Sequence, residues 1–147
     1  MTITTEHHLA PANSPSDRGA VLRATRLFTD DTGRARFEDV ELTMLPDPPP
    51  PDGTATSMPI AASAVLFARA GADTGHEERP EKGRQLAIGL AGSVRITASG
   101  EVRDFGPGTV LLIEDTTGSG HSAESAEGFL AAVVMLPEDD ALPEYLI

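Results

Sequence analysis

The sequence contains no cysteine and no tryptophan, and Tyr145 is the only tyrosine among its 147 residues. Without cysteine the chain can form no disulfide, no thiolate nucleophile and no Cys-based zinc or iron–sulfur site. Any chemistry must therefore come from other side chains. The length suits one domain, and a domain of this size can bury a core without a covalent cross-link or a structural metal.

Positive charge is also scarce, because 11 Lys and Arg stand against 23 Asp and Glu, for a net charge of −12. Phosphate backbones and anionic lipids repel so acidic a chain, so we expect neither nucleic acid nor a membrane as a partner. The sequence has no apolar run as long as a membrane span, and its first residues lack the basic and apolar regions of a secretory signal. We therefore expect a cytoplasmic protein.

Sustained helical periodicity is missing as well. Short apolar segments instead alternate with turns that contain glycine or proline, such as Ala91-Gly92, Ser99-Gly100 and Gly106-Pro107-Gly108. Strands at a spacing of about 8–12 residues are typical of an all-β sandwich or barrel. The pattern predicts more than seven strands in two packed sheets, with little helix.

Composition divides the chain into three parts. Residues 1–19 mix polar residues and proline without periodicity, and we expect a flexible tail in which His7 and His8 are solvated. Residues 20–137 carry the strand pattern and form the predicted β-barrel domain. Residues 138–147 form a predicted acidic tail.

Two polar stretches interrupt the barrel domain. The first, 46–57, contains four consecutive prolines, which lack amide donors and favour an extended surface loop. The second, 71–83, reads AGADTGHEERPEKG with its flanking alanine and is also predicted to be a loop. Between them, residues 58–70 form a predicted apolar strand.

One long segment carries a family resemblance. Residues 84–121 read RQLAIGLAGSVRITASGEVRDFGPGTVLLIEDTTGSGH, with Gly92 before a strand, a hairpin at Ser99-Gly100, the turn FGPG and a Gly-x-x-His ending at His121. This order resembles the cupin superfamily. The segment RLFTDDTGRARFEDVEL at 26–42 is similar to that of a bacterial subgroup of small single-domain cupins, and the resemblance spans about 22–137. It implies an RmlC-like jelly roll, or double-stranded β-helix, with an extra N-terminal strand region and a ligand pocket inside the barrel.

The resemblance is weakest at the metal motif of the family. The position of the motif glutamate corresponds to Gln85, and the two histidine positions before it fall among residues 78–81, which contain no histidine. The nearest upstream histidine is His76. The second motif keeps its histidine as His121, whereas Thr116 occupies the place of its proline. The family's four-ligand metal site is therefore incomplete in this sequence.

Alternation along the strand at 85–92 predicts what lines the pocket. If Gln85 points inward, as the resemblance implies, Ala87 and Gly89 share its face. These side chains are small, so we expect a cavity. Larger residues from other strands, among them Phe67 and Phe129, are predicted to bound it and contact a ligand, and Arg69 could bind a ligand carboxylate or enolate at its opening.

His121 has three open interpretations. It could bind a divalent metal such as iron, zinc, nickel or manganese together with His76 and Gln85. It could act without metal as an acid or base, with Asp115 orienting its ring. It could also serve only as a structural hydrogen-bonding group. In each functional interpretation, His121, Gln85 and His76 face one cavity.

The opposite face of the same strand carries Leu86, Ile88 and Leu90. These side chains offer more hydrophobic surface than one small barrel easily covers, so we expect a homodimer.

The predicted function is that of a small-molecule enzyme. The resemblance favours cyclisation, isomerisation or a related proton transfer on an apolar, oxygenated, polyketide-like metabolite of secondary metabolism. Two alternatives stay open, a metal-dependent oxygenase and a non-catalytic ligand-binding or sensor module.

Overall fold

The computed structural model describes residues 6–15, 17, 21–51 and 53–138. Within these residues the chain is all-β and contains no helix, so no helix could cross a membrane. The strands are β1 (Glu6–Leu9), β2 (Val21–Thr29), β3 (Ala35–Thr43), β4 (Ala64–Ala70), β5 (Thr74–Arg79), β6 (Gln85–Gly92), β7 (Val94–Ala98), β8 (Glu101–Phe105), β9 (Val110–Ile113), β10 (His121–Ser125) and β11 (Phe129–Met135).

The eight strands from β4 to β11 form a jelly roll. They make two antiparallel layers in the orders β4-β11-β6-β9 and β5-β10-β7-β8. This order places strands that are distant in sequence side by side, as two Greek keys do in a jelly roll. The prediction of an all-β barrel with two packed sheets is confirmed.

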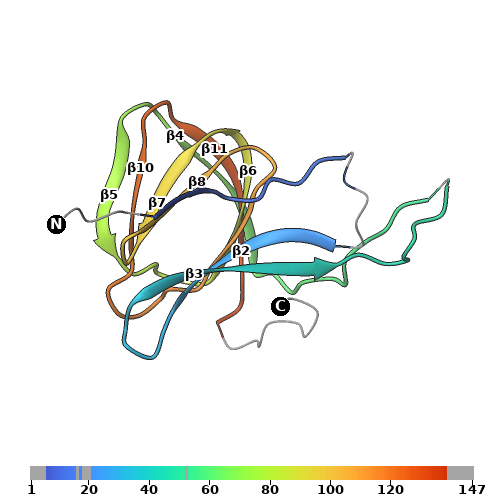
Figure 1. Cartoon of the computed structure of the whole chain (residues 1–147), viewed down its shortest axis with the longest axis horizontal. Coiled ribbons are helices and arrows are strands. Elements are labelled where there is room, and N and C mark those ends of the chain that lie inside the picture. The colour runs from blue at the N-terminus through green and yellow to red at the C-terminus, as the bar shows by residue number, and fades with distance from the viewer. Residues whose placement is uncertain (1–5, 16, 18–20, 52, 139–147) are drawn as a thin grey trace.

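The remaining strands extend both layers at one side. The hairpin β2–β3 joins the first sheet through a parallel pairing of β2 with β9, and β1 joins the second sheet by pairing parallel to β8. Figure 1 shows the hairpin beside the barrel and the proline-rich segment after β3 extending away from it. The extra N-terminal strand region is therefore present, and the described residues of 46–57 contain no strand, as predicted.

The prediction of a flexible tail over residues 1–19 is wrong for Glu6–Leu9, which form β1. The cause is a contact across the sequence, since the partner of His8 is Arg103 on β8. His7 is also held at its ring, where Nε2 lies 2.8 Å from Asp104 Oδ2. Residues 139–147 of the predicted C-terminal tail lie outside the described residues.

Two further predictions about local structure need correction. The stretch 71–83 contains β5, because β10 supplies its hydrogen-bonding partners even though TGHEER lacks apolar alternation. The strand predicted over 58–70 begins only at Ala64.

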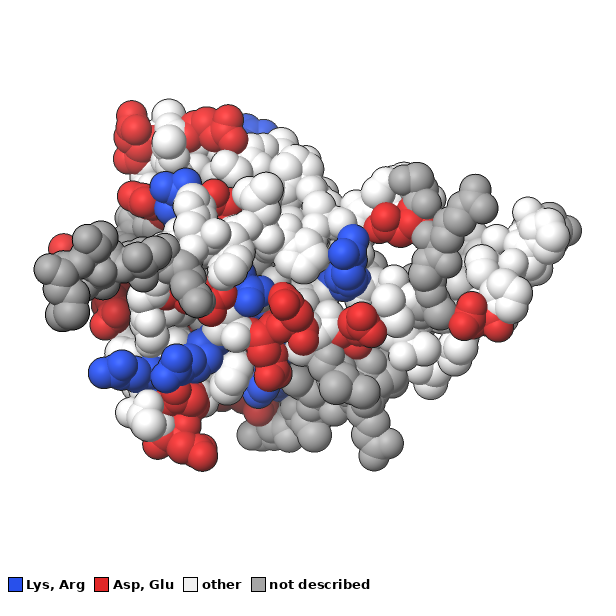
Figure 2. All heavy atoms as spheres, viewed as in Figure 1, with Lys and Arg blue, Asp and Glu red and all other residues white. Residues whose placement is uncertain are grey.

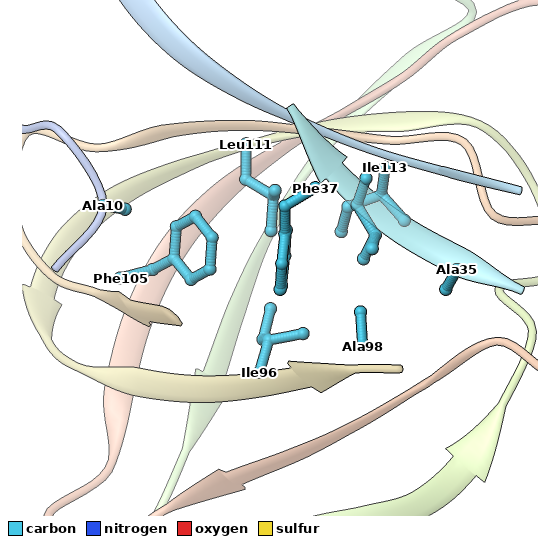
Figure 3. Close-up of a cluster of buried hydrophobic side chains, with 9 residues drawn as sticks. Ala10, Ala35, Phe37, Ile96, Ala98, Phe105, Leu111 and Ile113 are labelled. Carbon is cyan, nitrogen blue, oxygen red and sulfur yellow. The ribbon is translucent and has the colours of Figure 1, made fainter. Parts of the chain in front are cut away.

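Large apolar side chains fill only one part of the interior. Phe37 on β3 meets Phe105 on β8, with ring centroids 6.1 Å apart. Figure 3 shows them in a buried cluster with Ile96, Leu111 and Ile113, contributed by both sheets. The cluster lies where the hairpin β2–β3 covers the barrel. The interior between β4, β6 and β11 on one side and β5 and β10 on the other is lined by smaller residues.

The carboxylate of Asp104 on β8 lies where β1 joins the barrel, and its contacts can be tested. Its carboxylate accepts hydrogen bonds from Arg95 and contacts His7, and these partners, Arg95 above all, lower the pKa of Asp104 below its ordinary value against the opposing effect of partial burial. A carboxyl group whose pKa is lower in the folded state stabilises the fold above its unfolded-state pKa. That stabilisation is lost as the pH falls through the folded-state pKa.

We therefore expect Asp104→Asn to lower the free energy of unfolding at pH 7 by about 1 kcal/mol, the scale of a partly exposed ion pair. The difference from the wild type should shrink as the pH falls below 4. Chemical denaturation of both proteins at several pH values measures it. A difference that stays constant with pH would show that the ionised carboxylate contributes nothing.

Candidate functional site

The part of the interior that is not filled by the core cluster is a cavity of about 340 Å³. One wall is the inner face of the first sheet, where Ala87 and Gly89 of β6 lie beside Ala131 of β11. The other wall comes from β5, β7 and β10. Phe129 and Phe105 lie among the lining residues, and most of the lining is apolar. The predicted cavity is therefore present, and Ala87, Gly89 and Phe129 are among its lining residues.

Polar side chains gather at one region of this lining. His76, Glu81, Gln85 and His121 all line the cavity. Gln85 comes from the first residue of β6, and His121 from the first residue of β10. Strands β6 and β10 belong to different sheets, and the fold of the barrel places both side chains at one cavity. Gln85 and His121 therefore both line the cavity, from opposite sheets.

His76 also belongs to this group, but the element that carries it differs from the predicted one. It lies on β5 rather than on a loop, and its backbone pairs with Ala123 of β10. The rings of His76 and His121 meet edge to face, with centroids 5.2 Å apart. His76 Nδ1–H donates to the carbonyl oxygen of Glu77 at 2.8 Å when that nitrogen carries the proton.

Two predicted ligand contacts are wrong. Phe67 and Arg69 do not line the cavity, and Phe67 is 71% exposed. On β4 the residues that face inward are Ala68 and Ala70. The sequence interpretation assumed that the large side chains of this strand face the interior. The cavity instead exists because the small ones do.

The central feature of the site is a buried pair formed by His121 and Asp115. His121 Nδ1 lies 2.5 Å from Asp115 Oδ2, and the exposed fractions of the two residues are 2% and 0%. A carboxylate can only accept, so the imidazole donates its Nδ1–H to Asp115. In the neutral ring this leaves Nε2 with a free lone pair, 3.9 Å from Glu81 Oε2. The carboxylate thus sets which nitrogen of His121 can take up a proton.

The surroundings hold this pair in place. The carbonyl oxygen of Asp115 accepts a hydrogen bond from the backbone N–H of Glu81 at 3.0 Å, which ties the segment after β5 to the segment after β9. The neighbouring Glu114 binds Arg26 at 2.6 Å and Arg84 at 2.9 Å. Arg84 is therefore held outside the cavity lining. The second oxygen of Asp115, Oδ1, is buried without a hydrogen-bond partner.

The donor groups do not fit the metal site of the cupin family. Within the described part of the chain, no three His, Asp or Glu side chains converge as metal ligands would. His121 has already committed Nδ1 to Asp115, and the ring of His76 packs against that of His121 edge to face. Gln85, in the place of the family's glutamate, adds no negative charge. The arrangement favours hydrogen bonding and proton transfer by side chains.

Comparisons with known proteins find likeness in structure and none in sequence. No family model matches the chain, and no curated protein matches its sequence. Similar solved structures include a cupin superfamily protein from Desulfitobacterium hafniense, at 16% identity and a TM-score of 0.39, covering 54% of this chain and 84% of that one. An RmlC-like cupin from Shewanella frigidimarina has 10% identity and a TM-score of 0.39, covering 79% and 87%. A protein of unknown function from Rhizobium leguminosarum has 22% identity and a TM-score of 0.44, covering 50% and 68%.

The strand order of the chain itself defines a jelly roll. Within it, a buried His–Asp pair lies at the wall of a largely apolar cavity.

Proposed function

We propose that the protein is an enzyme that moves a proton on an apolar, oxygenated small molecule bound in the jelly-roll cavity. The observation that carries this proposal is the His121–Asp115 pair at the cavity wall. A histidine ring held by a buried carboxylate has a fixed tautomer, and its free nitrogen can accept and return a proton.

The other residues suit a carbonyl compound. The side-chain amide of Gln85 can donate to a ligand oxygen, and so stabilise the negative charge that develops there when a proton leaves the neighbouring carbon. His121 Nε2 takes that proton, and Asp115 stabilises the imidazolium that forms. Glu81 and His76 border the same space. Return of the proton to a different atom gives an isomerisation. Attack of the enolate carbon on a second carbonyl of the same molecule breaks that C=O π bond and gives a cyclisation, in which the new alkoxide takes the proton back from the His121 imidazolium.

The charge of the site also selects among ligands. Glu81 and Glu124 line the cavity and Asp115 lies buried behind His121, so these carboxylates outnumber Arg79, which lines the same cavity, in a protein with a net charge of −12. An uncharged ligand with a carbonyl group meets less repulsion there than a carboxylate or phosphate does. Apolar, uncharged ketones and diketones are therefore the substrate class that the cavity fits best.

The experiment that tests this function is hydrogen–deuterium exchange into simple ketones. The purified protein is incubated in D₂O with a panel of uncharged cyclic and aromatic ketones, and loss of the α-carbon proton is followed by NMR. We expect the wild type to accelerate exchange of at least one ketone above the buffer rate. His121→Ala should return the rate to background.

The matched control is His7→Ala, which removes a histidine that lies on β1 and does not line the cavity. This variant should exchange as fast as the wild type. Ketone binding without exchange in the wild type would instead identify a ligand-binding module. Exchange that persists in His121→Ala would contradict the assignment of His121 as the base.

A further inference from the structure

Three ionisable side chains at the cavity differ in how far water can reach them. The side chain of Asp115 is 0% exposed and that of His121 is 3% exposed. Glu81 lines the same cavity, and its side chain is 28% exposed. Its Oε2 atom lies 3.9 Å from Nε2 of His121, the nitrogen that carries no proton in the neutral ring. Asp115, His121 and Glu81 therefore form a row that runs from the buried interior to a surface that water reaches.

The backbone holds Glu81 against the segment that carries the other two residues. Arg79, two residues earlier, is the cross-strand partner of His121. The backbone N–H of Glu81 donates to the carbonyl oxygen of Asp115 at 3.0 Å. Gly120 permits this close packing, because a Cβ atom there would lie 2.0 Å from the backbone of Arg79. The fold therefore fixes the backbone of Glu81 beside the His121–Asp115 pair and leaves its side chain at the cavity.

A proton taken up by Nε2 of His121 has little direct access to water. The ring is almost completely buried, and Nδ1 is bound to Asp115. Among the described residues, Glu81 is the one carboxylate in a contact of ion-pair length with Nε2. The ring of His76 also meets His121, but Nδ1 of His76 lies 2.8 Å from the carbonyl oxygen of Glu77, so one of its two nitrogens already has a backbone partner. Glu81 is therefore the group best placed to take the proton onward.

The distance between Glu81 and His121 suits a transfer that follows proton uptake. A hydrogen bond from nitrogen to oxygen is about 2.9 Å long, so the carboxylate has to move by only about 1 Å, which rotation of its side chain provides. An ionised carboxylate then accepts the Nε2–H of the imidazolium. The N–H bond breaks, its electron pair returns to Nε2, and the new O–H group of Glu81 gives its proton to water.

We propose that Glu81 is a proton relay, which carries the proton of the substrate between Nε2 of His121 and water during turnover. This inference rests on the proposed function, in which His121 is the base. With the relay, the proton that returns to the substrate comes from the solvent. Without it, the proton stays on the ring and the same proton goes back to the substrate.

Isomerisation of the β,γ-unsaturated isomer of cyclohexenone in D₂O tests the relay. His121 removes a proton from the α-carbon, and addition of a proton at the γ-carbon gives the conjugated ketone. Ultraviolet absorbance measures the isomerisation, and NMR measures the deuterium at the γ-carbon. We expect mostly deuterated product from the wild type. In Glu81→Gln the ratio of deuterated to undeuterated product should fall about tenfold or more, because the amide cannot take up and release the proton.

A second variant distinguishes the relay from a structural role. Glu81→Ala should lose deuterium from the product in the same way, and added formate should restore it, because this small carboxylate fits the space that the side chain leaves. Circular dichroism verifies that both variants are folded. Equal deuterium contents in the wild type and Glu81→Gln, or a Glu81→Ala variant that formate does not rescue, would overturn the proposal while leaving His121 as the base.

The matched control is Glu78→Gln, which removes the same charge from an exposed position on β5 that does not line the cavity. Figure 2 shows acidic side chains spread over much of the face in view, so this control separates the position of Glu81 from the loss of one charge. Glu78→Gln should give the deuterium content of the wild type. A fall as large as that in Glu81→Gln would contradict the relay.

Exchange of the Nε2–H of protonated His121 with water tests the relay without a substrate. NMR with saturation of the water signal measures the exchange rate, which we expect to be about tenfold or more lower in Glu81→Gln than in the wild type. If this rate depends on Glu81 but the wild type isomerises no ketone, the relay is supported and the proposed function is contradicted. If ketones are isomerised but neither measurement depends on Glu81, the relay alone is overturned.

Discussion

Asp115→Asn is expected to keep the jelly roll and to abolish most of the proposed proton transfer. The carboxylate accepts the Nδ1–H of His121, which leaves Nε2 free as the base. An asparagine amide can donate to Nδ1 instead, and the ring then carries its proton on Nε2, where no lone pair remains for the substrate. In a serine protease the equivalent change lowers turnover about 10⁴-fold through the same change of tautomer. We expect the ketone exchange rate of Asp115→Asn to fall between 10²- and 10⁴-fold.

The tautomer can be measured directly, without a substrate. The ¹⁵N chemical shifts of the His121 ring distinguish a protonated nitrogen from one with a lone pair. In Asp115→Asn the ring proton should move from Nδ1 to Nε2. Glu81→Gln is the matched control, because it removes a carboxylate 3.9 Å from Nε2 and leaves the Nδ1 partner in place. Retention of the Nδ1 proton in Asp115→Asn would contradict this role of Asp115.

The substitution with the largest expected effect on stability is Gly120→Ala. Gly120 has a φ of +73°, and a Cβ atom there would lie 2.0 Å from the backbone carbon and oxygen of Arg79. A left-handed conformation costs an alanine about 1–2 kcal/mol. The backbone contact adds to this, because β5 would have to move away from β10. We expect the free energy of unfolding to fall by more than about 4 kcal/mol, which is exceptional for a single substitution.

Gly100→Ala separates the two contributions. Gly100 lies in the β7–β8 turn with a φ of +86°, but a Cβ atom added there would have open space, with no neighbouring atom within 4 Å. This variant should lose only about 1–2 kcal/mol, the cost of the conformation alone. Chemical denaturation of both variants measures the difference. Equal losses in the free energy of unfolding would show that the close approach of Gly120 to Arg79 does not contribute to stability. If Gly120→Ala folds at all, the ring contact between His76 and His121 should weaken, as loss of their NOEs would show.

Local patterns predicted the barrel because glycine and proline residues mark its turns in the sequence. Ser99-Gly100 forms the predicted hairpin, with both residues at positive φ. Alternation from Gln85 correctly placed Ala87 and Gly89 at the cavity, since a strand repeats every two residues. These features depend on residues that are neighbours in the chain.

The features that escaped prediction depend on partners far away in sequence. The polar segment of β5 becomes a strand because β10 pairs with it, and no local signal shows that pairing. The contact between Asp115 and His121 was one of several open interpretations, because a separation of six residues allows such a contact without requiring it. The inward face of β4 was misassigned because side-chain size cannot reveal whether an interior is filled or hollow.

The pairing of β1 has a consequence for how the protein behaves in a cell. Strand β8 would be an edge of its sheet without β1, with open N–H and C=O groups that can pair with another chain. With β1 in place, the edge of the sheet is a strand of only four residues, and a short edge strand limits pairing with other chains and so limits aggregation. Because β1 precedes β8 in the chain, it leaves the ribosome earlier, and β8 emerges into solution with its cover already synthesised.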